Sequence, residues 1–207
     1  MKDIFVGSIL ACIVLLNSGC PKSCIEANYS FSVNAQVGPD RDSINVGDTI
    51  YITSSFPAKL IDQGTGAEIN YTGAKKIGST LGVGKLKLGS AIPVDAVFDF
   101  SYISIKGNVY NDRGIASPDA VQQLIYQDSN NTYELKVGLI AKVKGTYALG
   151  IGNGLSVGRS GVKNCEKAAF DISLNKTNQH FNIYQSFTQN NQSNDYERKH
   201  AYYFVVK

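Results

Sequence analysis

Strict alternation of apolar and polar residues is the feature that most limits the fold of this chain. The longest such stretch is residues 132–144, whose apolar positions are Tyr133, Leu135, Val137, Leu139, Ala141 and Val143. Successive side chains of a strand point to opposite faces, so this pattern predicts a half-buried β-strand. Residues 29–37 repeat it, with an apolar face made of Tyr29, Phe31, Val33, Ala35 and Val37.

The same alternation predicts strands in residues 46–56, 93–102, 146–151, 165–176 and 200–207. In residues 93–102 it places Asp95 and Asp99 on the outer face. The apolar positions then change parity at Ile103 and Ile105, and a one-residue slip turns every side chain over. A β-bulge near Tyr102 is therefore expected.

Glycine and asparagine mark the breaks between these strands. Residues 57–93 contain seven glycines and are expected to form loops with short strands, at an edge or a binding surface. Asn153–Gly154 lies between two alternating stretches and predicts a β-hairpin. Residues 175–194, rich in Asn and Gln, have aromatic residues at a spacing of three, which predicts a short helix packed on the sheet: Phe181, Tyr184 and Phe187.

Composition agrees with a folded domain. The 207 residues are 43% hydrophobic and 18% charged, which is enough apolar material for a packed core. The net charge is only +3 and the lysines are scattered, so the chain lacks the basic patch of a nucleic-acid-binding protein. No linker rich in Pro and Ser divides it, and we expect one β-domain over residues 27–207.

The first nineteen residues have the features of a signal peptide. Lys2 precedes an uncharged run, residues 4–16, which is shorter than the roughly 20 residues that a membrane-spanning helix needs. The following "LLNSGC" resembles the bacterial lipobox, with Ser18 and Gly19 before the cysteine. The resemblance implies a lipoprotein signal peptide over residues 1–19, lipid attachment at Cys20 and a tether over residues 20–26. Ordinary secretion, with Cys20 as one more thiol, is the alternative.

Two cysteines remain after these assignments. Cys12 leaves with the signal peptide and Cys20 is lipidated, so Cys24 and Cys165 are left in an oxidising compartment. We predict a disulfide between them, which closes a loop of about 140 residues and for which the chain-entropy model gives roughly 5 kcal/mol as an upper figure. Two free buried thiols are the alternative.

No catalytic, cofactor or metal motif stands out in the sequence. The glycine stretches lack the phosphate-loop pattern, and neither GxSxG nor HExxH occurs. Asp95 and Asp99 lie about 13 Å apart on an extended strand, too far for a glycosidase pair. His180 and His200 have no ligand-like spacing to the cysteines and are interpreted as surface or packing residues. The sequence therefore predicts no catalytic residue, no cofactor and no metal ligand.

Several motifs carry a resemblance to known families. The "VGDTI" entry, the long alternating strand and "KGTYAL" resemble bacterial immunoglobulin-like modules, in which Tyr147 would be the tyrosine of the corner before a late strand. "SINVGDTIYITSSFP", "AVFDF" and "YALGIGNGLSVGR" resemble a family of Bacteroidetes lipoproteins. These resemblances imply an antiparallel immunoglobulin-like β-sandwich with irregular insertions and one short helix.

Two functions of different classes follow. The first is a non-enzymatic, lipid-anchored protein of the cell envelope, most simply at the outer membrane, that binds a protein or glycan partner and no nucleic acid. The second is an envelope hydrolase or carbohydrate-processing accessory. Its carboxylates would converge only in three dimensions, within about 5–10 Å in one pocket.

Overall fold

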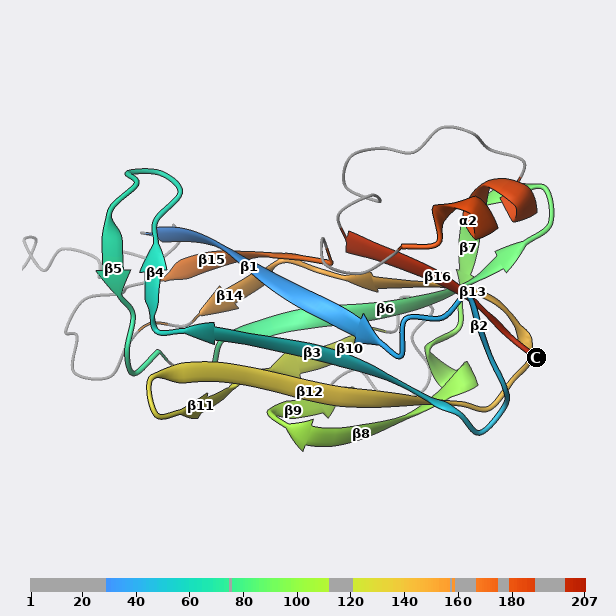
Figure 1. The fold of residues 1–207 in the computed structure, drawn as a ribbon, viewed down its shortest axis with the longest axis horizontal. Helices are drawn as coiled ribbons and strands as arrows, with labels where there is room; N and C mark the ends of the chain where they lie inside the picture. Colours follow the sequence, from blue (N-terminus) through green and yellow to red (C-terminus); the bar gives the residue numbers. More distant parts are fainter. Residues whose placement is uncertain are drawn as a thin grey trace, which may run out of the picture.

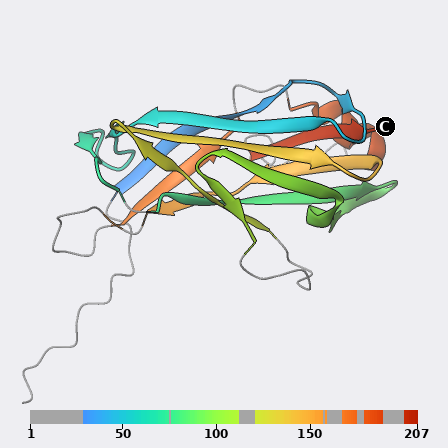
Figure 2. The same ribbon diagram turned by 90° about the horizontal axis from the view of Figure 1, so that it is seen from below.

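The computed structural model describes residues 29–74, 76–111, 121–156, 158, 167–174, 179–188 and 200–207. They form two β-sheets packed face to face, with one short α-helix against the outside (Figures 1 and 2). The predicted β-sandwich with a short helix is thus confirmed. The N-terminal segment and the four cysteines, including Cys20, Cys24 and Cys165, lie outside the described residues.

The strands divide between two sheets and one small hairpin. Sheet A contains β1 (Tyr29–Gly38), β2 (Ser43–Ile44), β6 (Gly78–Lys87), β7 (Ser90–Asp95), β9 (Asn108–Tyr110), β10 (Gln122–Ile125), β13 (Gly145–Ile151), β14 (Gly154–Ser156), β15 (Ala168–Ser173) and β16 (Ala201–Val206). Sheet B contains β3 (Thr49–Pro57), β8 (Phe100–Lys106), β11 (Gln127–Ser129) and β12 (Thr132–Ala141), and β1 joins it as well. The hairpin is β4 (Lys59–Ile61) with β5 (Glu68–Asn70).

Strand β1 belongs to both sheets. Its first part, Tyr29–Asn34, runs parallel to β15 in sheet A, whereas Ala35–Gly38 is antiparallel to β3 in sheet B. The predicted alternation holds through the change, because Phe31, Val33, Ala35 and Val37 are all buried. Among the described strands only β1–β15 and β16–β2 pair in parallel, so the sandwich is mixed where the sequence predicted an antiparallel one.

The alternating strands pack as the sequence predicts. The inner faces of β3, β12, β15 and β16 contribute to the core between the sheets, with Ile50, Ile52, Leu135, Val137, Leu139, Phe170, Ile172 and Phe204 all buried. Val143 is the exception in the long predicted row. It lies after the end of β12 and is 39% exposed.

The glycine-punctuated region contains a central strand, which corrects our expectation of loops and short strands. β6 pairs with β7, β10, β13 and β14. Its inner face alternates normally, with Ser79, Leu81 and Val83 buried. Gly84 lies on the outer face, where an added Cβ would be 2.6 Å from the Cβ of Pro93. Gly84 thus reflects the close approach of β7 to β6.

Residues 93–102 are not one strand. The chain runs through β7, a 3₁₀ turn η2 (Val97–Asp99) and then β8, and so passes from sheet A to sheet B. The side chain of Asp95 starts the turn, because its Oδ1 accepts a hydrogen bond from the Val97 amide at 3.1 Å. An unbroken strand with Asp95 and Asp99 on its outer face would place Val94 and Phe98 inside, but they are 43% and 39% exposed.

The expected bulge is present but lies further along β8. The register with β12 shifts between Ser104 and Lys106. Ile103 and Ile105, expected to turn inward, stay on the outer face and are 37% and 49% exposed.

The Asn153–Gly154 dipeptide forms a bulge and not a hairpin. β13 and β14 lie along the same side of β6, with Ile151 opposite Leu81 and Leu155 opposite Gly78. The chain therefore advances four residues on one strand and three on the other, which is one extra residue. A Cβ at Gly154 would collide with the carbonyl oxygen of Gly78, so this position of the bulge requires glycine.

The predicted tyrosine corner is confirmed. The Tyr147 hydroxyl lies 2.9 Å from the carbonyl oxygen of Val143 and 2.8 Å from Oδ2 of Asp99, and its one proton is shared between these acceptors. Burial, together with the Asp99 carboxylate, raises the pKa of Tyr147 above its usual range. The neutral hydroxyl fixes the crossover from sheet B to sheet A.

The short helix α2 (Phe181–Thr188) packs on the outside of sheet A, as expected. Tyr184 is buried against Tyr203 and Leu86, with ring centroids of the two tyrosines 5.1 Å apart. Phe181 and Phe187 are partly buried in the same cluster. The aromatic spacing thus serves packing.

The parallel pairing of β1 with β15 bears on the predicted disulfide. Tyr29 and Ala168 are register partners in a parallel pair, so β1 and β15 begin at the same end of the sandwich. Four residues separate Cys24 from Tyr29, and two separate Cys165 from Ala168. At about 3.3 Å per extended residue, both segments are long enough for the Cα separation of about 5.5 Å that a disulfide needs.

We predict that the mature protein carries a Cys24–Cys165 disulfide. Mass spectrometry of non-reduced proteolytic peptides should find the two cysteine peptides linked. Reduction should lower the free energy of unfolding by up to about 5 kcal/mol, because the loop that the bond closes is long. Recovery of both cysteines as free thiols would refute the pairing.

A candidate binding groove at the strand switch

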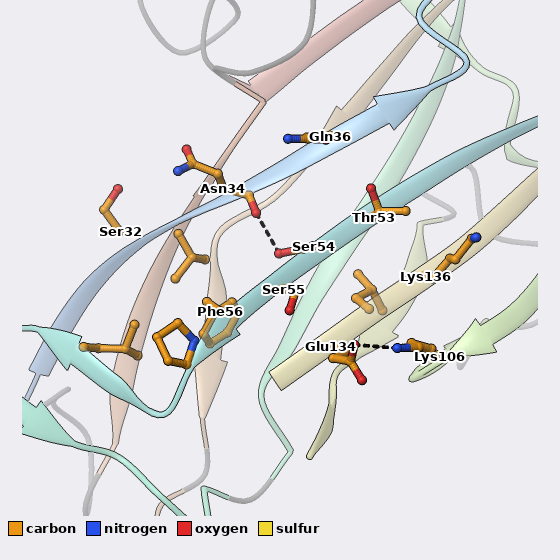
Figure 3. A pocket seen from close by; sticks show the side chains of 14 residues that line it. Ser32, Asn34, Gln36, Thr53, Ser54, Ser55, Phe56, Lys106, Glu134 and Lys136 are labelled. Carbon is orange, nitrogen blue, oxygen red and sulfur yellow. Dashed lines mark hydrogen bonds and ion pairs between the residues drawn. The ribbon is translucent and has the colours of Figure 1, made fainter. Parts of the chain in front are cut away.

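An open groove of about 590 Å³ lies where β1 leaves β3 to join sheet A (Figure 3). The two strands pair only as far as Ala35 and Ser54, and beyond that point they diverge. β3 remains paired with β12 on its other side up to Pro57. The groove is thus a direct consequence of the strand switch.

Nine of the fourteen residues that line the groove have polar side chains. From β1 come Ser32, Asn34 and Gln36, from β3 Thr53, Ser54 and Ser55, and from β8 and β12 Lys106, Glu134 and Lys136. Val33, Phe56, Pro57, Leu60 and Leu135 supply the apolar part. The outward positions of strands carry most of the polar groups, so the alternation that builds the core also builds this surface.

Asn34 is tied to both sheets at the point of divergence. Its carbonyl oxygen accepts a hydrogen bond from the Ser54 hydroxyl at 2.8 Å, and its side-chain Oδ1 accepts one from the Ser173 hydroxyl at 3.1 Å. Both serines are buried. The hydroxyl of Ser54 therefore satisfies a main-chain acceptor where the β1–β3 ladder ends.

A tyrosine lies behind this contact. Burial raises the pKa of Tyr126 to about 12, and the side chain of Ser54 beside it works in the opposite direction. The Tyr126 ring packs on Phe56, with centroids 5.2 Å apart. The wall of the groove behind Ser54 is thus neutral at physiological pH.

A buried carboxylate fixes the end of the groove that Leu60 closes. Asp62 follows β4 and accepts hydrogen bonds from the Ser30 amide at 2.9 Å and the Thr65 hydroxyl at 2.7 Å. These hydrogen bonds hold the pKa of Asp62 below its usual range, and the bond from the Ser30 amide has the largest effect. The charged form therefore fastens the β4–β5 hairpin to β1.

The charges in the groove are partly compensated. Lys106 and Glu134 form an ion pair across β8 and β12, and Figure 3 shows it on the wall opposite β1. Lys136 Nζ lies 5.3 Å from the centroid of the Tyr51 ring, and Tyr51 itself does not line the groove. Two lysines against one glutamate leave the groove weakly positive.

The groove presents hydrogen-bond donors and acceptors on a concave surface. Its lining residues include one carboxylate, that of Glu134. Hydroxyls and amides can both donate and accept, which suits a polar ligand such as a sugar or a peptide backbone. A pair of carboxylates, which the hydrolase hypothesis requires, is not formed by this lining. Within the described ranges, no three His, Cys, Asp or Glu side chains converge in a way that could hold a metal ion.

The aspartates and histidines considered in the sequence lie outside this groove. Asp99 accepts from Tyr147 and lies 3.5 Å from Lys85 Nζ, at the far end of the sandwich. His180 Nε2 is 2.8 Å from Asp40, and its carbonyl accepts from Ile183 at the start of α2. His200 is buried and donates from Nδ1 to the carbonyl of Ile172 at 2.7 Å. These contacts support the interpretation as surface and packing residues.

No sequence motif marks the residues that line the groove. The relevant sequence pattern is an uncharged outer face of β1, on which Ser32, Asn34 and Gln36 alternate with buried residues. That pattern describes any solvated strand. The divergence that turns it into a groove is set by β15, which lies more than 130 residues further along the chain.

Comparisons with known proteins give only distant likenesses. No protein-family model matches the chain, and no curated protein matches it. Among solved structures, a cohesin module from a Clostridium perfringens family 33 glycoside hydrolase is 14% identical over 69% of this chain and 97% of its own, with a TM-score of 0.32. The human F-spondin reeler domain is 12% identical over 74% and 93%, with a TM-score of 0.31.

A conjugative transposon lipoprotein from Bacteroides eggerthii is also similar, at 12% identity over 66% of this chain and 90% of its own, with a TM-score of 0.19. At such TM-scores the likeness carries no argument. The β-sandwich described above rests on the strand pairing itself. Among the described residues, no helix has the length and apolar character needed to cross a bilayer.

We predict that Ser54→Ala lowers the free energy of unfolding by about 1 kcal/mol, because the partly buried hydrogen bond from the Ser54 hydroxyl to the Asn34 carbonyl is lost. Urea denaturation measures this. Ser32→Ala, an exposed position in the same groove, is the matched control and should stay within about 0.5 kcal/mol of the wild type. Equal losses in the two variants would mean that the Ser54 contact does not stabilise the switch.

Proposed function

We propose that this protein is a lipid-anchored component of the bacterial cell envelope that binds a protein or glycan partner without catalysing a reaction. The observation that carries the proposal is the groove at the strand switch. It is open and about 590 Å³ in volume, and six of its fourteen lining residues carry hydroxyl or amide groups on strands of the sandwich. Sites built on strands hold their polar groups in fixed positions, which reduces the entropy lost on binding.

The anchor part of the proposal is supported by the sequence. Ser18–Gly19–Cys20 fits the lipobox, and the uncharged run before it fits a signal peptide. Several acyl chains at Cys20 would hold the protein stably at a membrane. Localisation at the outer membrane belongs to the same proposal.

We predict that Cys20→Ala abolishes acylation. Metabolic labelling with a clickable fatty acid should mark the wild-type chain and leave the variant unlabelled. Fractionation should then find the variant released from membranes. Cys24→Ala, which keeps the lipobox cysteine, is the control and should still be labelled. Continued labelling of the Cys20 variant would refute lipid attachment at that residue.

We predict that Ser55→Trp blocks partner binding. Ser55 is exposed and lines the groove from β3, so an indole there fills the space in which a partner would contact Thr53 and Gln36. Ser101→Trp adds the same bulk at an exposed position on β8, outside the groove lining. The unlipidated 21–207 chain is tested against an array of envelope glycans and by pull-down from envelope extracts.

Any ligand retained by the wild type and by Ser101→Trp should be lost by Ser55→Trp, with about a tenfold or greater drop in affinity. Circular dichroism confirms that both variants are folded. A ligand that binds Ser55→Trp as tightly as the wild type would place the contact elsewhere. Release of a cleaved product by the wild type would favour the hydrolase hypothesis.

A further inference from the structure

Strand β1 turns one edge of its main chain toward the groove. In a strand, the N–H and C=O of one residue point to the same side, and those of the next residue point to the other side. The Asn34 carbonyl points toward β3, where it accepts from the Ser54 hydroxyl at 2.8 Å. The Ser30 amide donates to Asp62 Oδ1 at 2.9 Å, and the Ser30 carbonyl accepts from the Gln63 amide at 2.7 Å. The even-numbered residues of β1 therefore face the groove, and the odd-numbered residues face β15.

Ser32 lies between these positions, and its groove side has no strand beside it (Figure 3). By the same alternation its N–H and C=O both face the groove. β3 pairs with β1 only from Ala35 onward, so within the described residues no strand covers this side of Ser32 or the Asn34 amide. The groove is thus edged by an N–H, a C=O and a second N–H at the two-residue spacing of a β-ladder.

The free edge is short because both of its ends are closed. At one end the bonds from Asp62 and Gln63 occupy the Ser30 main chain. At the other end the ladder between β1 and β3 begins at Ala35. Ser32 and Asn34 are exposed between these two points. The space therefore suits a short extended segment and not a long strand.

The wall opposite, on β3, presents acceptors. The Ala58 amide directly after β3 donates to the Asn131 carbonyl on the β12 side at 2.7 Å. The preceding residue, Pro57, therefore turns its carbonyl toward the groove, and Ser55 does the same two residues earlier. Proline has no amide hydrogen, so this wall lacks a donor at Pro57. β1 is thus the edge that offers both donors and an acceptor to an added strand.

Apolar side chains form the deep part of the groove. Val33, Phe56, Leu60 and Leu135 line it and are buried in the sandwich. Successive side chains of an added strand would point alternately toward these residues and toward solvent. The lining therefore fits a segment in which an apolar residue is flanked by polar ones.

We infer that the groove binds an extended polypeptide segment of a partner protein, which adds to β1 as a short strand along Ser32 and Asn34. The inference rests on the proposed function, since it concerns the same groove, and it selects a protein partner over a glycan. A polypeptide repeats its N–H and C=O groups every second residue along one edge, as the free edge of β1 does. A chain of sugar rings has hydroxyls but no such repeat of donors and acceptors.

A phage-displayed library of random short peptides is the first probe. The full-length chain, purified in mild detergent, is immobilised and used to select binding peptides. We expect enrichment of peptides that Ser55→Trp binds about tenfold or more weakly than the wild type, because the indole occupies their space. Ser101→Trp, outside the groove lining, is the matched control and should bind them as the wild type does.

N-methylation of a selected synthetic peptide tests the mode of binding. Each amide is methylated in turn, which removes one donor and adds bulk at that edge. Strand addition to β1 predicts an alternating result, since every second residue of the peptide turns its main chain toward β1. Affinity should fall about tenfold or more at those positions and much less at the positions between them.

Two substitutions at Ser32 separate its main chain from its side chain. Ser32→Pro removes the amide donor on the groove side, where no bond to β15 is lost, and should weaken peptide binding about tenfold. Ser32→Ala keeps the amide and removes the hydroxyl, so its loss of affinity should be much smaller. Thermal unfolding verifies that both variants fold. If Ser32→Pro does not fold, the N-methylation pattern and Ser55→Trp decide.

Several results would overturn the inference. They are a selection that enriches no peptide, peptides that Ser55→Trp binds as tightly as the wild type, a methylation pattern that does not alternate, equal losses in the two Ser32 variants, and a dimer of the chain that Ser55→Trp dissociates. If a glycan or a folded protein is lost by Ser55→Trp while no peptide binds, the proposed function stands and the inference fails. If Ser55→Trp weakens the binding of no ligand, both fail.

Discussion

The division of β1 between two sheets is the constraint on which the rest of the structure depends. One strand pairs with β15 through Asn34 and with β3 from Ala35 onward, so the two layers are joined within a single strand. A strand that changes partners must open a gap between its old and new neighbours. The Ser54 and Ser173 hydroxyls satisfy Asn34 at that gap, and the groove occupies the space that remains.

The sequence predicted the faces of strands better than their neighbours. Alternation identified the buried sides of β1, β3, β12 and β15, because burial of a strand face is a local pattern. It could not assign a strand to a sheet, since alternation is the same in both. The alternation therefore predicts one strand over residues 93–102, where the chain crosses between the sheets, and a hairpin at Asn153–Gly154, where β13 continues into β14 along β6. Gly84 lies too close to Pro93, and Gly154 too close to the Gly78 carbonyl, to carry a side chain. In the sequence these glycines resemble loop and turn residues, although both lie in strands.

The candidate site was out of reach of the sequence for a related reason. A catalytic or metal centre can be recognised in a sequence by residue types at characteristic spacings. A binding groove lined by serine, threonine, asparagine and glutamine has no such pattern. The feature that distinguishes Ser55 from Ser101 is the divergence of β1, which is fixed by pairing with distant strands. The tyrosine corner at Tyr147 could be predicted from the sequence, because its contact with Val143 spans only four residues.

The two ends of the sandwich differ in what holds them. Near the groove, Asp62 binds a hairpin to β1 through charge-assisted hydrogen bonds. At the opposite end, main-chain bonds between the β2–β3 turn, β12 and η2, together with the Tyr147 hydroxyl, brace the loops against one another. Both ends of the sandwich therefore depend on contacts between segments that lie far apart in the sequence, which alternation along a single strand does not reveal.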